Sequence, residues 1–421
     1  MPDPRRPTNG ERRTANAARR LVRPLQEFLH TETAGGALLP AATVAALIWA
    51  NAPFGGTYTD FWGAHITVDL RSITLDLPLV DWVNDGLMAV FFFVVGLEIK
   101  RELLRGELAG PRKAALPVIA ALGGMIVPAL IFLAFNLGRE GERGWGIPMA
   151  TDIAFAVGVL SLAGPRVPLS LKVFLLALAI VDDLGAIAII AIFYTDGLAL
   201  GWLAAAAALF ALTHGLGRAG IRHAAIYGGV GVIAWLAVHE SGIHATIAGV
   251  MMGLLIPSDR SPSESASVVY RLEHILHPWT SYAVVPVFAL ANAGIALDSG
   301  VVRDAVSSPV SLGVALGLML GKPIGIGLFA LVAVKLGVVS LPDGVRWQHI
   351  AAVGMVAGIG FTVSLFIIGL AFTDPALVDE AKLGVLAGSA LIGLAGLLAV
   401  RATSATAAQA RSDDASAESK R

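Results

Sequence analysis

The chain has 421 residues, of which 56% are hydrophobic and 14% are charged. A soluble domain carries about a quarter of charged residues, so this composition excludes an ordinary soluble protein and indicates a membrane protein. The chain contains no cysteine, which excludes disulfides, structural thiolate metal sites and thiol catalysis.

Apolar runs of about 17 to 25 residues, the length that crosses a bilayer as a helix, recur between short polar gaps. The runs are continuous rather than alternating, and lipid requires each segment to satisfy its own backbone amides, so they predict helices and not a barrel. We predict an all-α polytopic membrane protein. Its twelve expected spans are 34–53, 82–99, 114–136, 148–164, 169–194, 198–216, 224–240, 242–256, 279–297, 310–334, 348–372 and 381–401.

The distribution of Lys and Arg predicts the orientation. On these boundaries 23 of the 30 basic residues lie on one side of the spans, four lie on the other side, and Lys172, Lys322 and Lys382 lie within spans. The positive-inside rule then places both termini in the cytoplasm. A secretory signal ending near Ala50-Asn51-Ala52 is the alternative for the N-terminus, but the apolar run is long for a signal core and cleavage would leave eleven spans.

Residues 1–24 and 402–421 lack any apolar period, so we expect disordered cytoplasmic tails on both sides of a helical domain at 25–401. The outward segment ITVDLRSITLDLP, residues 66–78, alternates apolar and polar residues. It predicts a small β-hairpin at about 64–80. The exposed edge of such a hairpin could remain unpaired or could join a second copy of the chain, which makes a homodimer contact one of two open interpretations.

An odd number of spans, seven, separates the third span from the tenth. Two three-helix units that begin there would run in opposite directions, as in an inverted repeat, with the fourth and eleventh spans as counterparts. The fourth opens with GWGIPMATDIAF and is cut at Gly164-Pro165, and the eleventh carries VGMVAGIGFTVS, with Gly354, Gly358 and Gly360. Small residues for close helix packing are the alternative explanation of these glycines, but their paired placement favours two broken helices.

Two adjacent acids, Asp182 and Asp183, interrupt the apolar run LALAIVDDLGAIAII. Two aspartates at the centre of a span cost roughly 5 to 7 kcal/mol on insertion, about as much as the apolar residues of this span return. These acids must therefore face protein or a water-filled cavity. Neighbouring helical residues point about 100° apart, so the two carboxylates are expected to have different roles.

Lys322, in LMLGKPIGIGLF, lies too far from either end of the tenth span to reach water, so it requires a buried anion. Asp182 and Asp152 are the candidates, and the sequence does not decide between them. Asp152 and Thr151, in PMATDIAFA, begin a short helix. An N-cap is the ordinary explanation, but beside a helix break the same acid could neutralise facing helix N-termini.

Asp85 lies about one turn inside the outward end of its span, so a solvated helix end and a position on an ion path are both open. Glu98 closes the other end of the same helix. With Arg101 and Glu102 it predicts a charged cytoplasmic rim, for which a plain interface cluster is the alternative.

The cytoplasmic segment YRLEHILHPW adds Glu273, His274 and His277. Two imidazoles near an acid titrate in the physiological pH range, so a pH sensor is a possible function of this segment. His244, in SGIHATIAG, is interpreted as a satisfied core histidine rather than as a ligand.

Carboxylate, hydroxyl and carbonyl oxygens suit hard cations, which makes sodium, lithium or a proton the natural cargo. Burial and a neighbouring like charge both disfavour ionisation of a carboxylate. Protons and sodium would then compete for the same acids. If the site opens to one side of the membrane at a time, inward proton flow drives the cation out, with no cofactor and no enzymatic step.

The segments ATDIAFA, LALAIVDDLGAIAII, VFFFVVGLEIKREL, SGIHATIAG, RLEHILHPW, GKPIGI and GIGFTVS together resemble the bacterial NhaA sodium/proton antiporters, from about residue 25 to 400. The inverted repeat is a known plan of this family, so it does not support the resemblance independently. The resemblance implies twelve helices with the fourth and eleventh broken and crossed, and an inner-membrane homodimer joined partly by the hairpin. It also implies electrogenic exchange of sodium or lithium for protons, which regulates intracellular pH and sodium.

The resemblance also implies residue roles. Asp183 matches the principal carrier of cation and proton, and Asp182 matches a second carrier or the partner of Lys322. Asp152, next to Thr151 in the same motif, and Lys322 match the charges that balance the facing helix ends, and Asp85 matches a position in the ion pathway. The pH-sensing cytoplasmic face of the family corresponds to Glu98, Arg101, Glu102, Glu273, His274 and His277.

The sequence departs from the family at Tyr270, where we expect a lysine in the pH-sensing stretch, and in a longer N-terminal tail. Two rival functions remain to be weighed. A sodium-coupled solute symporter would share the inverted-repeat plan, but it needs a polar pocket for an organic substrate. An intramembrane aspartyl protease needs its two acids on separate facing helices, whereas the chief pair here is adjacent.

Overall fold

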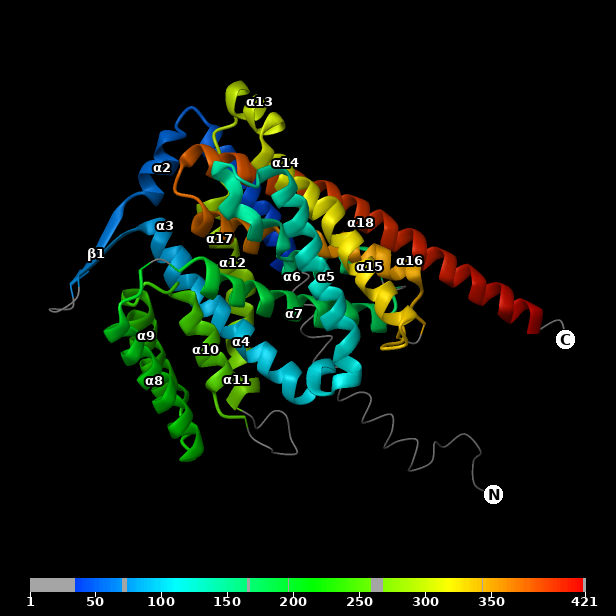
Figure 1. Ribbon diagram of the computed structural model, residues 1–421, viewed down its shortest axis with the longest axis horizontal. Coiled ribbons are helices and arrows are strands. Elements are labelled where there is room, and N and C mark those ends of the chain that lie inside the picture. The colour runs from blue at the N-terminus through cyan, green and yellow to red at the C-terminus, as the bar shows by residue number, and fades with distance from the viewer. Residues whose placement is uncertain are drawn as a thin grey trace, which may run out of the picture.

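The computed structural model describes residues 35–69, 74–164, 167–195, 197–258, 268–342 and 344–418, with side chains as far as residue 403. The predicted N-terminal tail, the tip of the hairpin and Pro165 lie outside the described residues. Within the described part, the chain is almost entirely helical (Figure 1).

Six helical runs in the described part are long and apolar enough to cross a membrane: Leu79–Arg105, Pro111–Asn136, Leu169–Phe193, Leu200–Arg218, Pro309–Lys335 and Pro375–Thr403. Three pairs of helices could each form one bent span. They are Gly35–Asn51 with Gly56–Trp62, bent by 117°, Glu140–Met149 with Ile153–Leu162, bent by 46°, and Trp347–Ala357 with Phe361–Ala371, bent by 47°. Two apolar helices, Ala224–Glu240 and Thr246–Leu255, are shorter.

The labels of Figure 1 follow chain order. Up to the middle of the chain the helices are α2 (Gly56–Trp62), α3 (Leu79–Asp81), α4 (Met88–Arg105), α5 (Pro111–Asn136), α6 (Ile153–Leu162), α7 (Leu169–Phe193), α8 (Leu200–Arg218), α9 (Ala224–Glu240) and α10 (Thr246–Leu255). The later helices are α11 (Val268–Trp279), α12 (Val285–Asn292), α13 (Ser299–Ser307), α14 (Pro309–Leu316), α15 (Lys322–Lys335), α16 (Trp347–Ala357), α17 (Phe361–Ala371) and α18 (Pro375–Glu418).

Shorter non-α segments join several of these helices. Two are 3₁₀ segments, η2 (Glu107–Ala109) and η3 (Glu140–Met149), and three are π-helical, η1 (Trp82–Leu87), η5 (Thr280–Val284) and η6 (Gly317–Gly321). Because a π-helical turn inserts one extra residue, it rotates the following helix about its axis and often marks a functional position. One of the three contains Asp85 and another directly precedes Lys322.

The predicted hairpin is present. Strands β1 (His65–Asp69) and β2 (Thr74–Pro78) pair antiparallel, with Ile66 opposite Leu77 and Val68 opposite Leu75. The hairpin projects from the helical body (Figure 1). It forms because β-branched residues alternate with polar ones, which suits a strand pair with one sheltered face.

Both helix breaks that the glycine pattern predicted are present. The first separates η3 from α6 at residues 150–152, and the second separates α16 from α17 at residues 358–360. At the other end of the fourth span, α6 stops at Leu162, and Gly164 has a φ of +96°, which ends the helix there.

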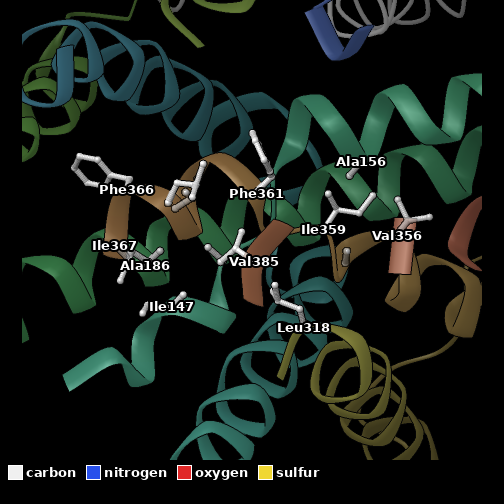
Figure 2. Packing of buried hydrophobic residues seen from close by; sticks show 14 of the residues in the cluster. Ile147, Ala156, Ala186, Leu318, Val356, Ile359, Phe361, Phe366, Ile367 and Val385 are labelled. Atoms are coloured by element: carbon white, nitrogen blue, oxygen red, sulfur yellow. The ribbon is translucent and has the colours of Figure 1, made fainter. Parts of the chain in front are cut away.

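The largest hydrophobic core surrounds the breaks. Figure 2 shows Ile147 of η3, Leu318 of η6 and Ile359 of the second break packed in one cluster, and all three are fully buried. The region of α8 and α9 differs, because α8 is mostly exposed and packs on α9 and α10 at one side of the molecule (Figure 1).

Two boundaries differ from the sequence prediction. The ninth span begins earlier, because RLEHILHPW is already helical in α11, so the segment predicted as a cytoplasmic loop is the first part of a continuous helical run. Helix α18 continues to Glu418, so most of the predicted C-terminal tail is helical. The tail is rich in alanine, the strongest helix former, and a missing apolar period does not prevent helix formation.

Candidate functional site

The two helix breaks lie against each other. The Asp152 amide donates to the Ile359 carbonyl at 2.7 Å, and the Thr151 hydroxyl donates to the Ala357 carbonyl at 2.8 Å. A Cβ on Gly360 would lie 3.0 Å from the Ala150 carbonyl oxygen, so only glycine permits this approach without a shift of the neighbouring backbone. The two breaks therefore form one crossing. At this crossing each broken segment provides a hydrogen-bond partner for a backbone group of the other segment.

Asp152 caps two helices at this crossing. Its Oδ1 accepts from the Phe155 amide of α6 at 2.9 Å, and its Oδ2 accepts from the amide and hydroxyl of Thr362 at the start of α17, at 3.0 and 2.7 Å. A helix N-terminus carries a partial positive charge. The Asp152 carboxylate thus faces two such termini. It is both the N-cap of α6 and an acid placed between two facing helix N-termini, so both interpretations of the sequence apply.

Lys322 pairs with Asp182, which decides the alternative that the sequence left open. Its Nζ lies 2.5 Å from Asp182 Oδ2 and 3.0 Å from Thr151 Oγ1, and both charged side chains are completely buried. The cation therefore lies next to the Ala357 carbonyl at the C-terminal end of α16, linked to it through Thr151. A helix C-terminus carries a partial negative charge, which favours a cation there.

Asp183 has a different environment from its neighbour. Its side chain is 3% exposed, and Oδ1 has no hydrogen-bond partner. It lines a cavity of about 40 Å³, together with residues from α4, the crossing, η5 and α17. That volume is enough for a water molecule or a partly hydrated cation. Because adjacent helical side chains point about 100° apart, Asp182 is paired with Lys322 while Asp183 faces the cavity.

The same cavity reaches Glu98 and His277, which are part of the predicted rim. His277 Nε2 lies 3.6 Å from Glu98 Oε1, and both side chains are less than a tenth exposed. Arg101 forms an ion pair with the buried Glu273 and lies 3.6 Å from Glu102. We call these five residues the rim cluster: Glu98, Arg101, Glu102, Glu273 and His277. The cluster joins α4 to α11.

His274 does not belong to this cluster. It is exposed, and its ring stacks on Tyr270 with centroids 5.8 Å apart. His274 and His277 lie three residues apart on α11, and only His277 is buried.

Asp85 lies at the other end of α4, between two imidazoles. Its Oδ2 lies 3.6 Å from His239 Nδ1, and its Oδ1 lies 3.6 Å from His244 Nε2. The interpretation of His244 as a satisfied histidine is wrong in one respect, because its Nε2 has no hydrogen-bond partner and faces this acid; whether it is a ligand stays a prediction. Trp235 stacks on His239 and donates to the Asp85 carbonyl at 2.9 Å, which fixes this arrangement.

Sequence reasoning missed three groups around these sites. His239 stands at the end of α9, and only the folded chain brings it to Asp85. Thr280 and Ser281 line the cavity from η5. The signal that could have found the last two is a pair of hydroxyl residues directly after the HPW motif, at the start of an apolar run.

The carboxylates and hydroxyls of the cavity suit a hard cation that passes through, and among the described residues no group of three His, Asp or Glu forms a resident metal site. Comparison with known proteins agrees with this reading. The family described as Na+/H+ antiporter 1 matches residues 26–400.

Relatives named Na(+)/H(+) antiporter NhaA are similar over nearly their whole length. The protein of Yersinia enterocolitica is 51% identical over 384 residues, which cover 90% of this chain and 96% of the relative. Those of Shewanella sp. strain ANA-3 and Escherichia coli O139:H28 are 51% and 50% identical, over 88% and 87% of this chain and 96% and 94% of the relatives. The chain therefore belongs to the NhaA family of Na+/H+ antiporters, multi-pass membrane transporters and not enzymes.

Proposed function

We propose that Asp183 is the group for which sodium and protons compete, and that the protein exports sodium or lithium in exchange for protons across the bacterial inner membrane. The observation that carries this proposal is the unpartnered Asp183 Oδ1 in the cavity. A buried carboxylate without a donor is costly when ionised. It is therefore stable with either a proton or a cation bound, and binding of one displaces the other.

Electrogenic exchange requires more than one proton for each sodium ion. The Asp182–Lys322 pair is the titratable group next to Asp183 and provides a place for the second proton. When a cation binds Asp183, it repels Lys322 and favours loss of a proton from the pair. In this scheme Asp152 and Lys322 remain the charges that stabilise the crossed helix ends.

Glu98 and His277 of the rim cluster line the cavity together with Asp183, which supports access to Asp183 from that side. The positive-inside rule assigns this side to the cytoplasm, because the basic segment between α4 and α5 directly follows the helix that carries Glu98 and Arg101. The cycle then releases protons to the cytoplasm and loads sodium. It continues with a change of access at the crossing, after which sodium leaves and protons bind outside, near the cluster of Asp85, His239 and His244.

We further propose twelve spans. The six long runs and three bent pairs account for nine, and α9, α10 and the run α11–η5–α12 supply the others. We assign the projecting hairpin as a contact between two copies in a homodimer, because its outer strand edge is unpaired. The rim cluster is proposed as the pH sensor, with His277 as its titrating group.

The test is Asp183→Asn in proteoliposomes that contain a pH dye. Asparagine has nearly the same shape but cannot be protonated at neutral pH, so sodium-dependent proton movement should fall to the level of empty liposomes. Calorimetry of the parent protein should show proton release on sodium binding, and the variant should show neither heat nor release. Retention of sodium-driven proton movement by Asp183→Asn would refute the assignment.

A further inference from the structure

The π-helical segment η5 brings two hydroxyl side chains into the wall of the cavity. Thr280 and Ser281 are its first residues, are 3% and 5% exposed, and line the cavity together with Asp183. Buried hydroxyls in an apolar span are costly unless they find partners. The extra residue of the π-turn sets the angle at which these two side chains leave the helix.

The hydrogen bond of Thr280 leaves its oxygen available as an acceptor. The hydroxyl donates its proton to the His277 carbonyl at 2.8 Å, one turn earlier in the same helix. A hydroxyl has one proton and two lone pairs. With its proton held by the backbone, the oxygen can present its lone pairs to a cation, and oxygen ligands are those that hard cations prefer.

The hydroxyl of Thr151 is in a different position. It donates to the Ala357 carbonyl and already accepts from the Lys322 ammonium. A lone pair bound to a cationic side chain is a poor ligand for a second cation. Thr151 therefore serves the crossing, and the hydroxyls of η5 are better suited to the transported ion.

Ser281 is fixed by close packing from behind. A Cβ on Gly35, at the start of the first described helix, would lie 3.0 Å from both Ser281 Cβ and the Ser281 carbonyl oxygen. The absence of a side chain at Gly35 lets that helix close directly over η5. The position of the serine is thus determined by the backbone of two helices, which gives the cavity wall little freedom to adapt to ion size.

We propose that Thr280 and Ser281 are ligands of the cation bound at Asp183 and determine its preference between sodium and lithium. The inference rests on the proposed role of Asp183. The cation is attracted most strongly by the carboxylate, and the hydroxyls add neutral oxygen ligands from η5 in the same cavity. The larger sodium ion can contact the carboxylate and these oxygens together, whereas the smaller lithium ion lies closer to the carboxylate and gains less from the hydroxyls.

The experiment compares Thr280→Val, Ser281→Ala and Thr280→Ser in the full-length protein in proteoliposomes, with sodium chloride or lithium chloride as the probe. Thr280→Val should raise the apparent KM for sodium about 3- to 10-fold, with kcat nearly retained, because one oxygen ligand is lost and water replaces it only in part. The KM for lithium should rise less. Thr280→Ser should recover most of the sodium affinity, and Ser281→Ala should follow Thr280→Val with a smaller change.

Thr213→Val is the matched control. Thr213 is a fully buried threonine in α8 whose hydroxyl also donates to a carbonyl one turn earlier, that of Leu209, but it does not line the cavity. Its substitution should leave both KM values unchanged, while a general packing effect would change all threonine variants alike.

The proposal is overturned if Thr280→Val and Ser281→Ala keep the parental KM and the parental ratio of sodium to lithium, or if Thr213→Val shifts them equally. Asp183→Asn is measured in parallel. If it abolishes transport while the hydroxyl variants stay parental, only the ligand assignment fails. If it transports normally, the site itself is wrong.

Discussion

The crossing and the rim cluster both hold buried charge, but they hold it in different ways. At the crossing, Asp152 accepts from two backbone amides and a hydroxyl, and Asp182 Oδ2 is paired with the Lys322 ammonium while Asp182 Oδ1 has no hydrogen-bond partner; all three side chains are buried. In the rim cluster, charged side chains and an imidazole from α4 and α11 meet across a helix interface. On the function proposed above, we expect the crossing to act as a rigid carrier and the rim cluster to respond to pH.

The largest effect is expected from breaking the pair at the crossing. Lys322→Met leaves Asp182 buried without its cation, which should cost about 3 to 5 kcal/mol of unfolding free energy and abolish antiport. Thermal unfolding in detergent and dye-based transport measure the two effects. The double variant Asp182→Asn with Lys322→Met removes both charges and should regain most of the stability without transport. An unchanged melting temperature for Lys322→Met would show that the pair is not the rigid element of the crossing.

The second effect concerns the rim. Protonated His277 can hold Glu98 by charge, which keeps α11 on α4 at low pH, and deprotonation weakens this contact as pH rises. His277→Gln cannot form the charged pair, so the midpoint of antiport against pH should move to lower pH, by about half to one unit. Transport assayed from pH 6 to 9 in proteoliposomes tests this. His274→Gln is the comparison, since His274 is exposed and its substitution should shift the midpoint less; equal shifts would contradict the role of His277.

The smallest effect lies far from both regions, in the hairpin. The Thr67 hydroxyl and then His65 hold the pKa of Asp76 below its ordinary value. A carboxyl whose pKa is lower in the folded state stabilises that state above its ordinary pKa, and this contribution is lost as pH falls through the lowered value. Acidification should therefore loosen the hairpin, and Asp76→Asn should remove this pH dependence.

The natural chain has no cysteine, so the hairpin can be observed with two spin labels on Asp69→Cys and Thr74→Cys, which lie opposite each other. The spin–spin interaction should weaken on acidification in the protein with Asp76 and stay constant in Asp76→Asn. The same pH response in both proteins would assign the change to another group.

Much of this molecule could be predicted from local sequence. The runs around Asp182 and Asp183 had to be buried helix, because two carboxylates in an apolar segment cannot face lipid. Glycines at 358 and 360 marked a real break, and alternation from residue 66 to 78 marked a real hairpin. In each case the free energy of insertion into lipid, or the conformational preference of the backbone, depends on neighbouring residues. It can therefore be evaluated without knowing the fold.

The partners in the site could not be predicted in this way. Lys322 had two possible acids, and the choice of Asp182 depends on how α7 and α15 meet across 140 positions of the chain. His244 looked like a core histidine because Asp85 reaches it only through the packing of α4 against the end of α9 and the start of α10. Thr280 was not singled out from the sequence, because only the folded chain brings it to the cavity that Asp183 lines.

The sequence by itself determined that this protein lies in the membrane, where its helices break and which acids are buried, because the free energy of moving each residue into lipid is set by the residue and its neighbours. Only the tertiary structure decided which buried charge is neutralised and which is left open to an ion. Electrostatic pairing depends on distances of a few ångströms between distant segments, and those distances exist only once the helices have crossed.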